Sequence, residues 1–144
     1  MTQTNPKSLS HFERDLSRSL ARRGKALLEA DDLTRQVSRM EPLEVYFMVK
    51  ELGLESAGPI LMCASADQLQ AFVDLDCWQG EHINFDDIDV WLAPFASLSS
   101  QALVAAFLSL EDQLQALYLR DALVIFQKVD DEIPTSGRKD VRNR

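Results

Sequence analysis

Histidine and cysteine, which often act as nucleophiles, proton carriers or metal ligands, each occur only twice in this 144-residue sequence. The two histidines, His11 and His82, are far apart, and neither has a second ligand at a metal-binding spacing. We therefore expect both histidines to face solvent. The two cysteines, Cys63 and Cys77, do not form a CxxC pair, and we interpret both as small core side chains.

Sequence motifs that carry known chemistry are also missing. The GxSxG, P-loop, GxGxxG and HExxH patterns do not occur, and the five glycines are not clustered into a phosphate-binding loop. An enzyme needs reactive groups held close together, and no such set is visible here. We therefore predict that the protein is not an enzyme and has no catalytic residues, no cofactor-binding residues and no cofactor.

One segment begins like a calcium-binding loop. DLDCWQGEHINF (74–85) starts with the D-x-D pattern of an EF-hand, but Phe85 occupies the twelfth position, where a bidentate glutamate is required. Nearby acids could instead gather around Mg²⁺, which would offset the repulsion between close carboxylates. A solvated acidic surface is the commoner interpretation, so we predict no metal ligands. The acids concerned are Asp74, Asp76, Asp86, Asp87 and Asp89.

Charge is distributed unevenly along the chain, whose net charge is −8. Residues 1–39 carry a net +3, residues 40–137 a net −14, and residues 138–144 a net +3. The acidic central region repels nucleic acids and anionic membranes, so only the two basic end segments could attract them. The basic side chains of the first segment could bind RNA, an acidic protein or the chain's own acidic region. They are Arg14, Arg18, Arg22, Arg23 and Lys25. No aromatic platform accompanies them, so nucleic acid is an unlikely partner.

Apolar spacing and capping residues predict a succession of short helices. The expected helices cover about 11–29, a short stretch after Asp31 or Asp32, a segment from Pro42 to Gly53, and about 55–63. Ser65 and Gln68 form a capping box for the next helix, and Asn84, Ser99 and Ser109 are expected to begin three more. QGEHIN (79–84) is predicted as the longest internal loop. Trp78 and Trp91 lie on apolar stripes, so we expect them in the core rather than at an interface.

The pentapeptide DQLQA occurs twice, beginning at Asp67 and at Asp112. Short helices with a matching segment two helices later indicate stacked helical hairpins in which each repeat needs its neighbours to bury its apolar stripe. We therefore predict an all-α fold of short helices stacked as helical hairpins, a superhelix or repeat-like bundle. We expect residues 1–9 to be a flexible N-terminus, residues 10–130 a single all-helical domain, and residues 131–144 a disordered basic tail.

The remaining features favour a soluble intracellular protein. No apolar run is long enough to span a bilayer, and the N-terminus has no apolar signal region. Two unpaired cysteines fit a reducing compartment, so we expect a cytoplasmic location without membrane insertion.

The stretch from Leu43 to Trp78 resembles an uncharacterised bacterial family, a domain of unknown function found in deltaproteobacteria and their relatives. The matching pieces are YF (46–47), VKE (49–51), GLE (53–55), AS (64–65), QLQ (68–70) and DLD (74–76) with Trp78. The resemblance extends from LARRGKALLEA (20–30) to about Val129. It implies that the chain is a short member or an N-terminal portion, and the family has no established activity to transfer.

A looser pattern of short leucine-rich helices with acidic surfaces is similar to the N-terminal helical domain of MgtE-type magnesium transporters. That resemblance implies a helical superhelix and a possible role in sensing Mg²⁺. From the residues, our leading hypothesis is a non-catalytic helical scaffold that binds another protein, with self-association into a homodimer left open. The alternative is a Mg²⁺-responsive regulatory domain that uses an acidic helical surface.

Overall fold

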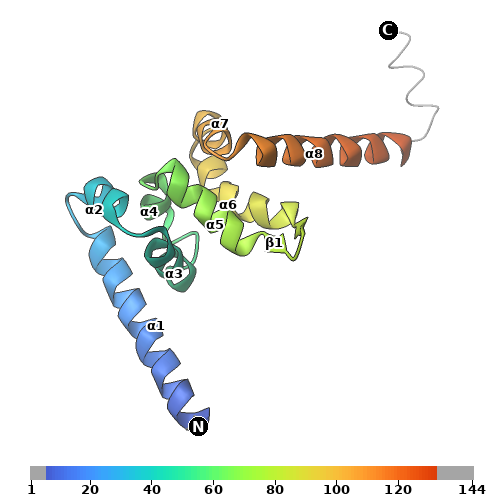
Figure 1. The fold of residues 1–144 in the computed structure, drawn as a ribbon. Helices are drawn as coiled ribbons and strands as arrows, with labels where there is room; N and C mark the ends of the chain where they lie inside the picture. The colour runs from blue at the N-terminus through green and yellow to red at the C-terminus, as the bar shows by residue number, and fades with distance from the viewer. Residues whose placement is uncertain (1–5, 133–144) are drawn as a thin grey trace. The chain divides into compact units, whose positions relative to one another are not determined.

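The structure, a computed structural model, describes residues 6–132 and is all-α, as predicted from the sequence (Figure 1). The chain divides into two compact units, residues 1–110 and 111–144. The first unit contains α1 (Pro6–Leu28), α2 (Leu33–Arg39), α3 (Pro42–Leu52), α4 (Gly58–Met62), α5 (Ala66–Asp76), β1 (Trp78–Gln79), β2 (His82–Ile83), α6 (Phe85–Leu98) and α7 (Ser100–Leu108). The described part of the second unit is α8 (Asp112–Glu132).

Most helix boundaries follow the predicted capping residues. Pro42 opens α3, and Gly53 ends it with a φ of 85°, a backbone conformation that favours glycine. Ser65 and Gln68 make both hydrogen bonds of the predicted capping box at α5. Asn84 and Ser99 accept hydrogen bonds from the first turns of α6 and α7.

Three helix starts differ from the prediction. The short helix α4, predicted over about 55–63, begins at Gly58. The first helix begins at Pro6, ahead of the predicted start near residue 11. Ser109 does not begin a helix: it is the C-cap of α7, and its hydroxyl donates to the Ala106 carbonyl at 2.6 Å. The chain then re-enters a helix at Asp112.

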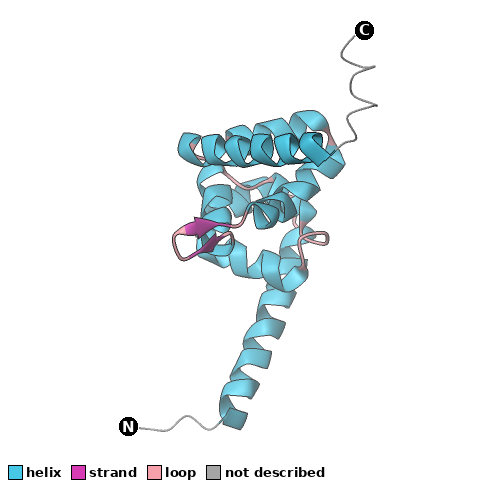
Figure 2. Cartoon of the chain, turned by 90° about the vertical axis from the view of Figure 1, so that its right-hand side faces the viewer, coloured by secondary structure: helices cyan, strands magenta, loops and turns pink. Residues whose placement is uncertain are grey.

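The segment predicted as a long loop is a small β-hairpin (Figure 2). Trp78 pairs with Ile83 and Gln79 with His82, and Gly80 takes a φ of 64° in the turn between them. The hairpin carries Trp78 away from the core, so the prediction that Trp78 is buried is wrong: its exposed fraction is 41%. The same prediction for Trp91 is confirmed, since Trp91 is fully buried.

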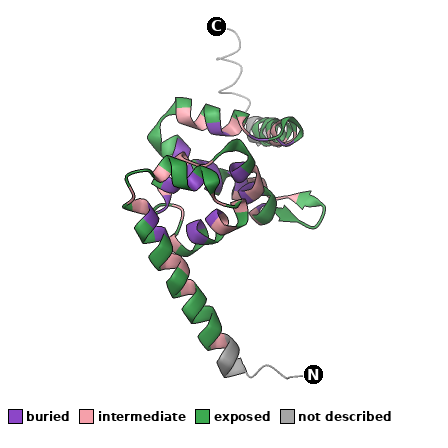
Figure 3. Cartoon of the chain, turned by 60° about the vertical axis from the view of Figure 1, so that its left-hand side comes forward, coloured by how far each residue is buried: buried purple, intermediate pink, exposed green. Residues whose placement is uncertain are grey.

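The core of the first unit lies between successive helices (Figure 3). The helix α1 packs on α3, α3 on α5, α5 on α6 and α6 on α7, while the short α4 contacts α1, α2 and α6. A Cβ added to Gly24 of α1 would lie 2.6 Å from a methyl group of Leu52, so the absence of a side chain allows α1 and α3 to approach closely. The largest fully buried side chains are Trp91, Phe72, Ile60, Leu61, Ile88, Val37, Val45, Val49, Val73 and Cys77.

The two DQLQA segments each begin a helix, but their glutamines do different things. Gln68 is 2% exposed, and its Nε2 donates to the carbonyls of Val37 at 2.7 Å and Met40 at 3.0 Å. It thereby satisfies carbonyls at the C-terminal end of α2. Gln113 is exposed, and the residue three positions before it is Leu110 rather than a serine, so it cannot form the same capping box. The internal repeat therefore stays a prediction from the sequence.

Parts of the predicted termini fall outside the described residues. These are residues 1–5 of the N-terminus predicted to be flexible and residues 133–144 of the predicted basic tail. Within the described part of the chain, every helix is too short or too polar to cross a membrane.

Replacement of Gly53 by alanine tests the backbone strain at the end of α3. A Cβ meets no atom within 4 Å there, so the positive φ is the main cost. We expect Gly53→Ala to lower the free energy of unfolding by about 1–3 kcal/mol, measured by urea denaturation. The control is Ser56→Ala, an exposed position nearby whose φ is not positive. Equal stability of Gly53→Ala and the wild type would contradict this explanation.

Candidate functional site

The Asp76 carboxylate is the centre of the most connected polar cluster in the described structure. Trp91 Nε1 donates to Asp76 Oδ2 at 2.8 Å, and the Tyr46 hydroxyl donates to Asp76 Oδ1 at 2.8 Å. Lys50 Nζ lies 3.2 Å and 3.1 Å from the two carboxylate oxygens and forms a salt bridge with them. Donors from α3 and α6 therefore converge on the last residue of α5.

Local sequence explains how these donors reach one carboxylate. Tyr46 and Lys50 are four residues apart and so lie on the same face of α3. Aromatic packing fixes the third donor, because the Trp91 ring stacks on Tyr46 at 6.0 Å and on Phe72 at 5.4 Å between centroids. The cluster is thus a polar cap over an aromatic core.

The cluster favours the protonation states that maintain its own hydrogen bonds. Burial opposes ionisation of Asp76, but hydrogen bonds from Trp91, Tyr46 and Lys50 outweigh it and hold its pKa below the ordinary value. Burial, together with the Asp76 hydrogen bond and charge, raises the pKa of Tyr46 to about 12. The phenol therefore stays a donor at neutral pH, and Asp76 stays an acceptor whose oxygens already have partners.

The cysteines lie in different environments. Burial, followed by the charge of Asp76, raises the pKa of Cys77 to about 12, so its thiol is not a nucleophile at neutral pH. Cys77 is fully buried, as predicted for a core side chain. Cys63 is half-buried, with its Sγ 3.3 Å from Thr34 Oγ1.

The acids that could have gathered around Mg²⁺ do not form a ligand set. Among the described residues there is no group of three or more His, Cys, Asp or Glu side chains that could hold a metal ion. Asp76 is engaged by its three donors, and Asp74 accepts a hydrogen bond from Gln70 at 2.9 Å. His11 and His82 are exposed, as predicted.

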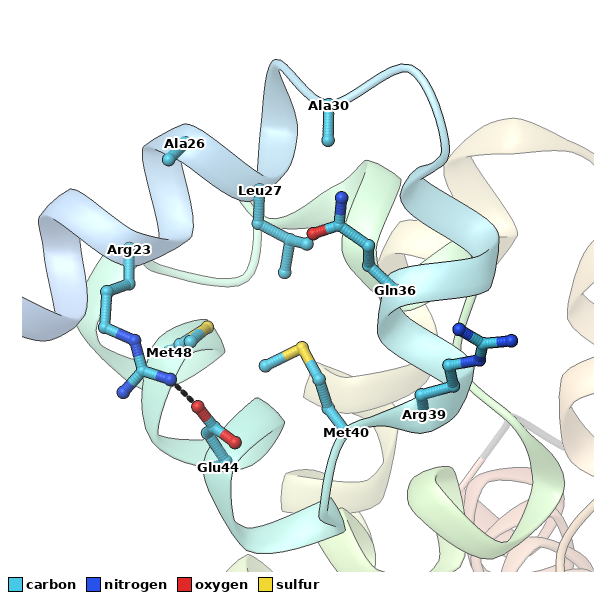
Figure 4. Close-up of a pocket in the computed structure, with 9 residues that line it drawn as sticks. All are labelled: Arg23, Ala26, Leu27, Ala30, Gln36, Arg39, Met40, Glu44 and Met48. Carbon is cyan, nitrogen blue, oxygen red and sulfur yellow. Dashed lines mark ion pairs between the residues drawn. The ribbon is translucent and has the colours of Figure 1, made fainter.

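A separate pocket of about 510 Å³ lies between α1, α2 and α3 (Figure 4). Its apolar lining comes from Ala26, Leu27, Ala30, Met40 and Met48, and its polar lining from Arg23, Gln36, Arg39 and Glu44. Arg23 forms an ion pair with Glu44, and Figure 4 shows Arg23 and Arg39 on opposite sides of the group of lining residues. We call this the methionine pocket.

The basic residues predicted as a binding surface are only partly used by the chain itself. Arg23 pairs with Glu44 on α3, which agrees with the expectation that some of this charge meets the chain's own acids. Arg14, Arg18 and Arg22 are exposed and form no ion pair with any residue of the described range. Sequence reasoning missed the methionine pocket because its walls come from three helices, and no single stretch of sequence marks it.

The chain belongs to DUF6178, a family of unknown function whose model matches residues 2–143. This agrees with the predicted membership of an uncharacterised family. No curated protein and no solved structure matches the chain at a significant level.

Substitution of Asp76 tests the structural role of the cluster. Asp76→Asn removes the charge that three donors share, so we expect the free energy of unfolding at neutral pH to fall by about 1–3 kcal/mol. The control is Asp74→Asn. Asp74 is an exposed acid two residues earlier on the same helix, so we expect this substitution to leave the stability nearly unchanged.

We also expect the stability difference between the wild type and Asp76→Asn to depend on pH. Because the folded-state pKa of Asp76 is lowered, its contribution is present above the unfolded pKa of about 3.9 and is lost as the pH falls through the folded value. The stability difference between wild type and Asp76→Asn should therefore shrink in acid, as measured by denaturation at several pH values. A difference that stays constant down to strongly acidic pH would contradict the assignment.

Proposed function

We propose that this protein is a non-catalytic, cytoplasmic interaction module that uses the methionine pocket to hold a segment of another protein. The observation that carries the proposal is the combination of an apolar, methionine-lined pocket with two arginines, Arg23 and Arg39, among its lining residues. Methionine side chains adapt their shape to different apolar partners, which suits them to binding surfaces.

The charges at the opening define the partner's chemistry. Arg39 is exposed and makes no ion pair with any residue between 6 and 132, whereas Arg23 shares its charge with Glu44. Arg22 precedes Arg23 on α1 and adds positive charge near the pocket. An acidic segment that inserts an apolar side chain would therefore complement both the lining and the rim. Helix-in-groove recognition uses this combination of anchor and charge.

Two further features support the non-catalytic and cytoplasmic parts of the proposal. The described residues that most resemble reactive groups, Asp76 and Cys77, are held in protonation states that suit packing. Cys63 and Cys77 are free thiols, which fits a reducing compartment.

Affinity capture with a matched pair of variants tests this function. The full chain is immobilised and exposed to lysate of the native organism, and Arg39→Glu is compared with Arg35→Glu. Both positions are exposed arginines on α2 and undergo the same charge change, but only Arg39 lines the pocket. We expect a stoichiometric protein partner that Arg39→Glu loses and Arg35→Glu retains, with binding that weakens as salt rises.

Several results would overturn the proposal. They are equal capture by both variants, or capture of no protein at low and moderate salt. Capture that requires Mg²⁺ at constant ionic strength would instead favour the Mg²⁺-responsive alternative.

A further inference from the structure

The helix α6 carries apolar residues on its buried face and also on a neighbouring face. Ile88, Trp91, Leu92 and Phe95 are buried in the core of the first unit. On the outer side, Val90 is 52% exposed and Leu98 is 66% exposed, with the half-buried Pro94 between them at helical spacing. Exposed apolar residues that extend beyond the buried face of a helix can mark a surface that binds a partner.

A groove of about 520 Å³ runs beside this outer face, within the first unit. One wall comes from Leu54, Glu55 and Gly58, and the other from Val90, Ala93, Pro94 and Ser97 of α6. We call it the α6 groove. Small residues keep it open: no atom lies within 4 Å of the position that a Cβ on Gly58 would occupy. Its volume is in the range of sites that hold one or two large side chains.

Apart from the Ser97 hydroxyl, which donates to the Ala93 carbonyl at 3.0 Å, the polar groups considered at the α6 groove are acceptors. Pro94 has no backbone N–H, so the Val90 carbonyl lacks the hydrogen bond that the helix would otherwise provide. Glu55 carries a carboxylate on the opposite wall. Asp86 lies outside the lining, one turn before Val90 on the same face of α6. Neither carboxylate forms an ion pair with any residue in the described part of the chain.

We infer that the α6 groove binds an apolar helical segment of another protein that carries an arginine. A guanidinium offers several N–H donors in one plane, so it can reach a carboxylate and a backbone carbonyl together. Apolar side chains beside it would cover Val90 and Pro94. This surface is separate from the methionine pocket and selects a partner of the opposite charge.

The probe is a synthetic helical peptide of about 15 residues with leucines four positions apart and one arginine between them. A second peptide has glutamate in place of that arginine. Each is titrated into the isotope-labelled full chain, and backbone amide shifts are followed by NMR. We expect the arginine peptide to shift the amides of Gly58, Val90, Ala93 and Ser97, and the glutamate peptide to leave them in place.

Two variants with the same charge change locate the binding. Ala93→Arg fills the groove and repels the peptide's arginine, so we expect its affinity to fall at least about tenfold. Ala96→Arg lies on the same helix, is also exposed, and does not line the groove, so we expect the wild-type affinity. Glu55→Gln should weaken binding of the arginine peptide without disturbing the fold.

Three outcomes would overturn the inference. They are equal binding of the two peptides, shifts centred away from the groove, and equal binding by Ala93→Arg and Ala96→Arg. The oligomeric state of all three proteins is measured in parallel by sedimentation. A change of that state in Ala93→Arg, with no peptide binding to the wild type, would show that a second copy of the chain occupies the groove and would also overturn it.

Discussion

The partly buried charge of Asp76 is the constraint on which the first unit most depends. A carboxylate removed from water is costly unless hydrogen-bond donors compensate it, and here a tyrosine, a lysine and a tryptophan do so. Two of these donors belong to α3 and the third to α6, so a single carboxylate at the end of α5 sets the position of both neighbouring helices. The Tyr46, Phe72 and Trp91 rings then stack beneath it, and the hairpin begins directly after it. The hydrogen bonds to Asp76 and the packing of the aromatic rings therefore favour the same arrangement of α3, α5 and α6.

Sequence reasoning predicted the parts of this fold that local chemistry decides. Pro42, Ser65, Asn84 and Ser99 mark helix starts because each satisfies or avoids an unpaired N–H within a few residues. The hairpin was missed because two pairs of residues are too short to show strand alternation, and Trp78 was then placed on a helical stripe that ends at Asp76. Tyr46 and Lys50 could be assigned to one face of a helix, but nothing in their spacing identifies a carboxylate 30 and 26 residues further along.

The paired DQLQA segments show the limit of sequence identity as a guide to structural role. In the first copy, Gln68 is buried because the C-terminal carbonyls of α2 lie within reach of its amide. In the second copy the same letters begin α8, and Gln113 is exposed. What the two segments share is a polar first turn followed by a leucine, which is a helix-start pattern. The contact that makes Gln68 important depends on tertiary structure, so five matching residues could not predict it.

The two proposed surfaces follow from the uneven charge of the chain. The methionine pocket is bordered by the basic N-terminal segment, which carries a net +3 over residues 1–39, whereas the α6 groove lies in the acidic region. If the regions around the two sites carried charge of the same sign, one partner could occupy either site. The apolar linings alone would then discriminate poorly between partners. Opposite signs add a repulsive penalty to the wrong pairing as well as an attraction to the right one. Under these two proposals, a small helical protein with two apolar recesses distinguishes two partners, which is the property that a scaffold needs.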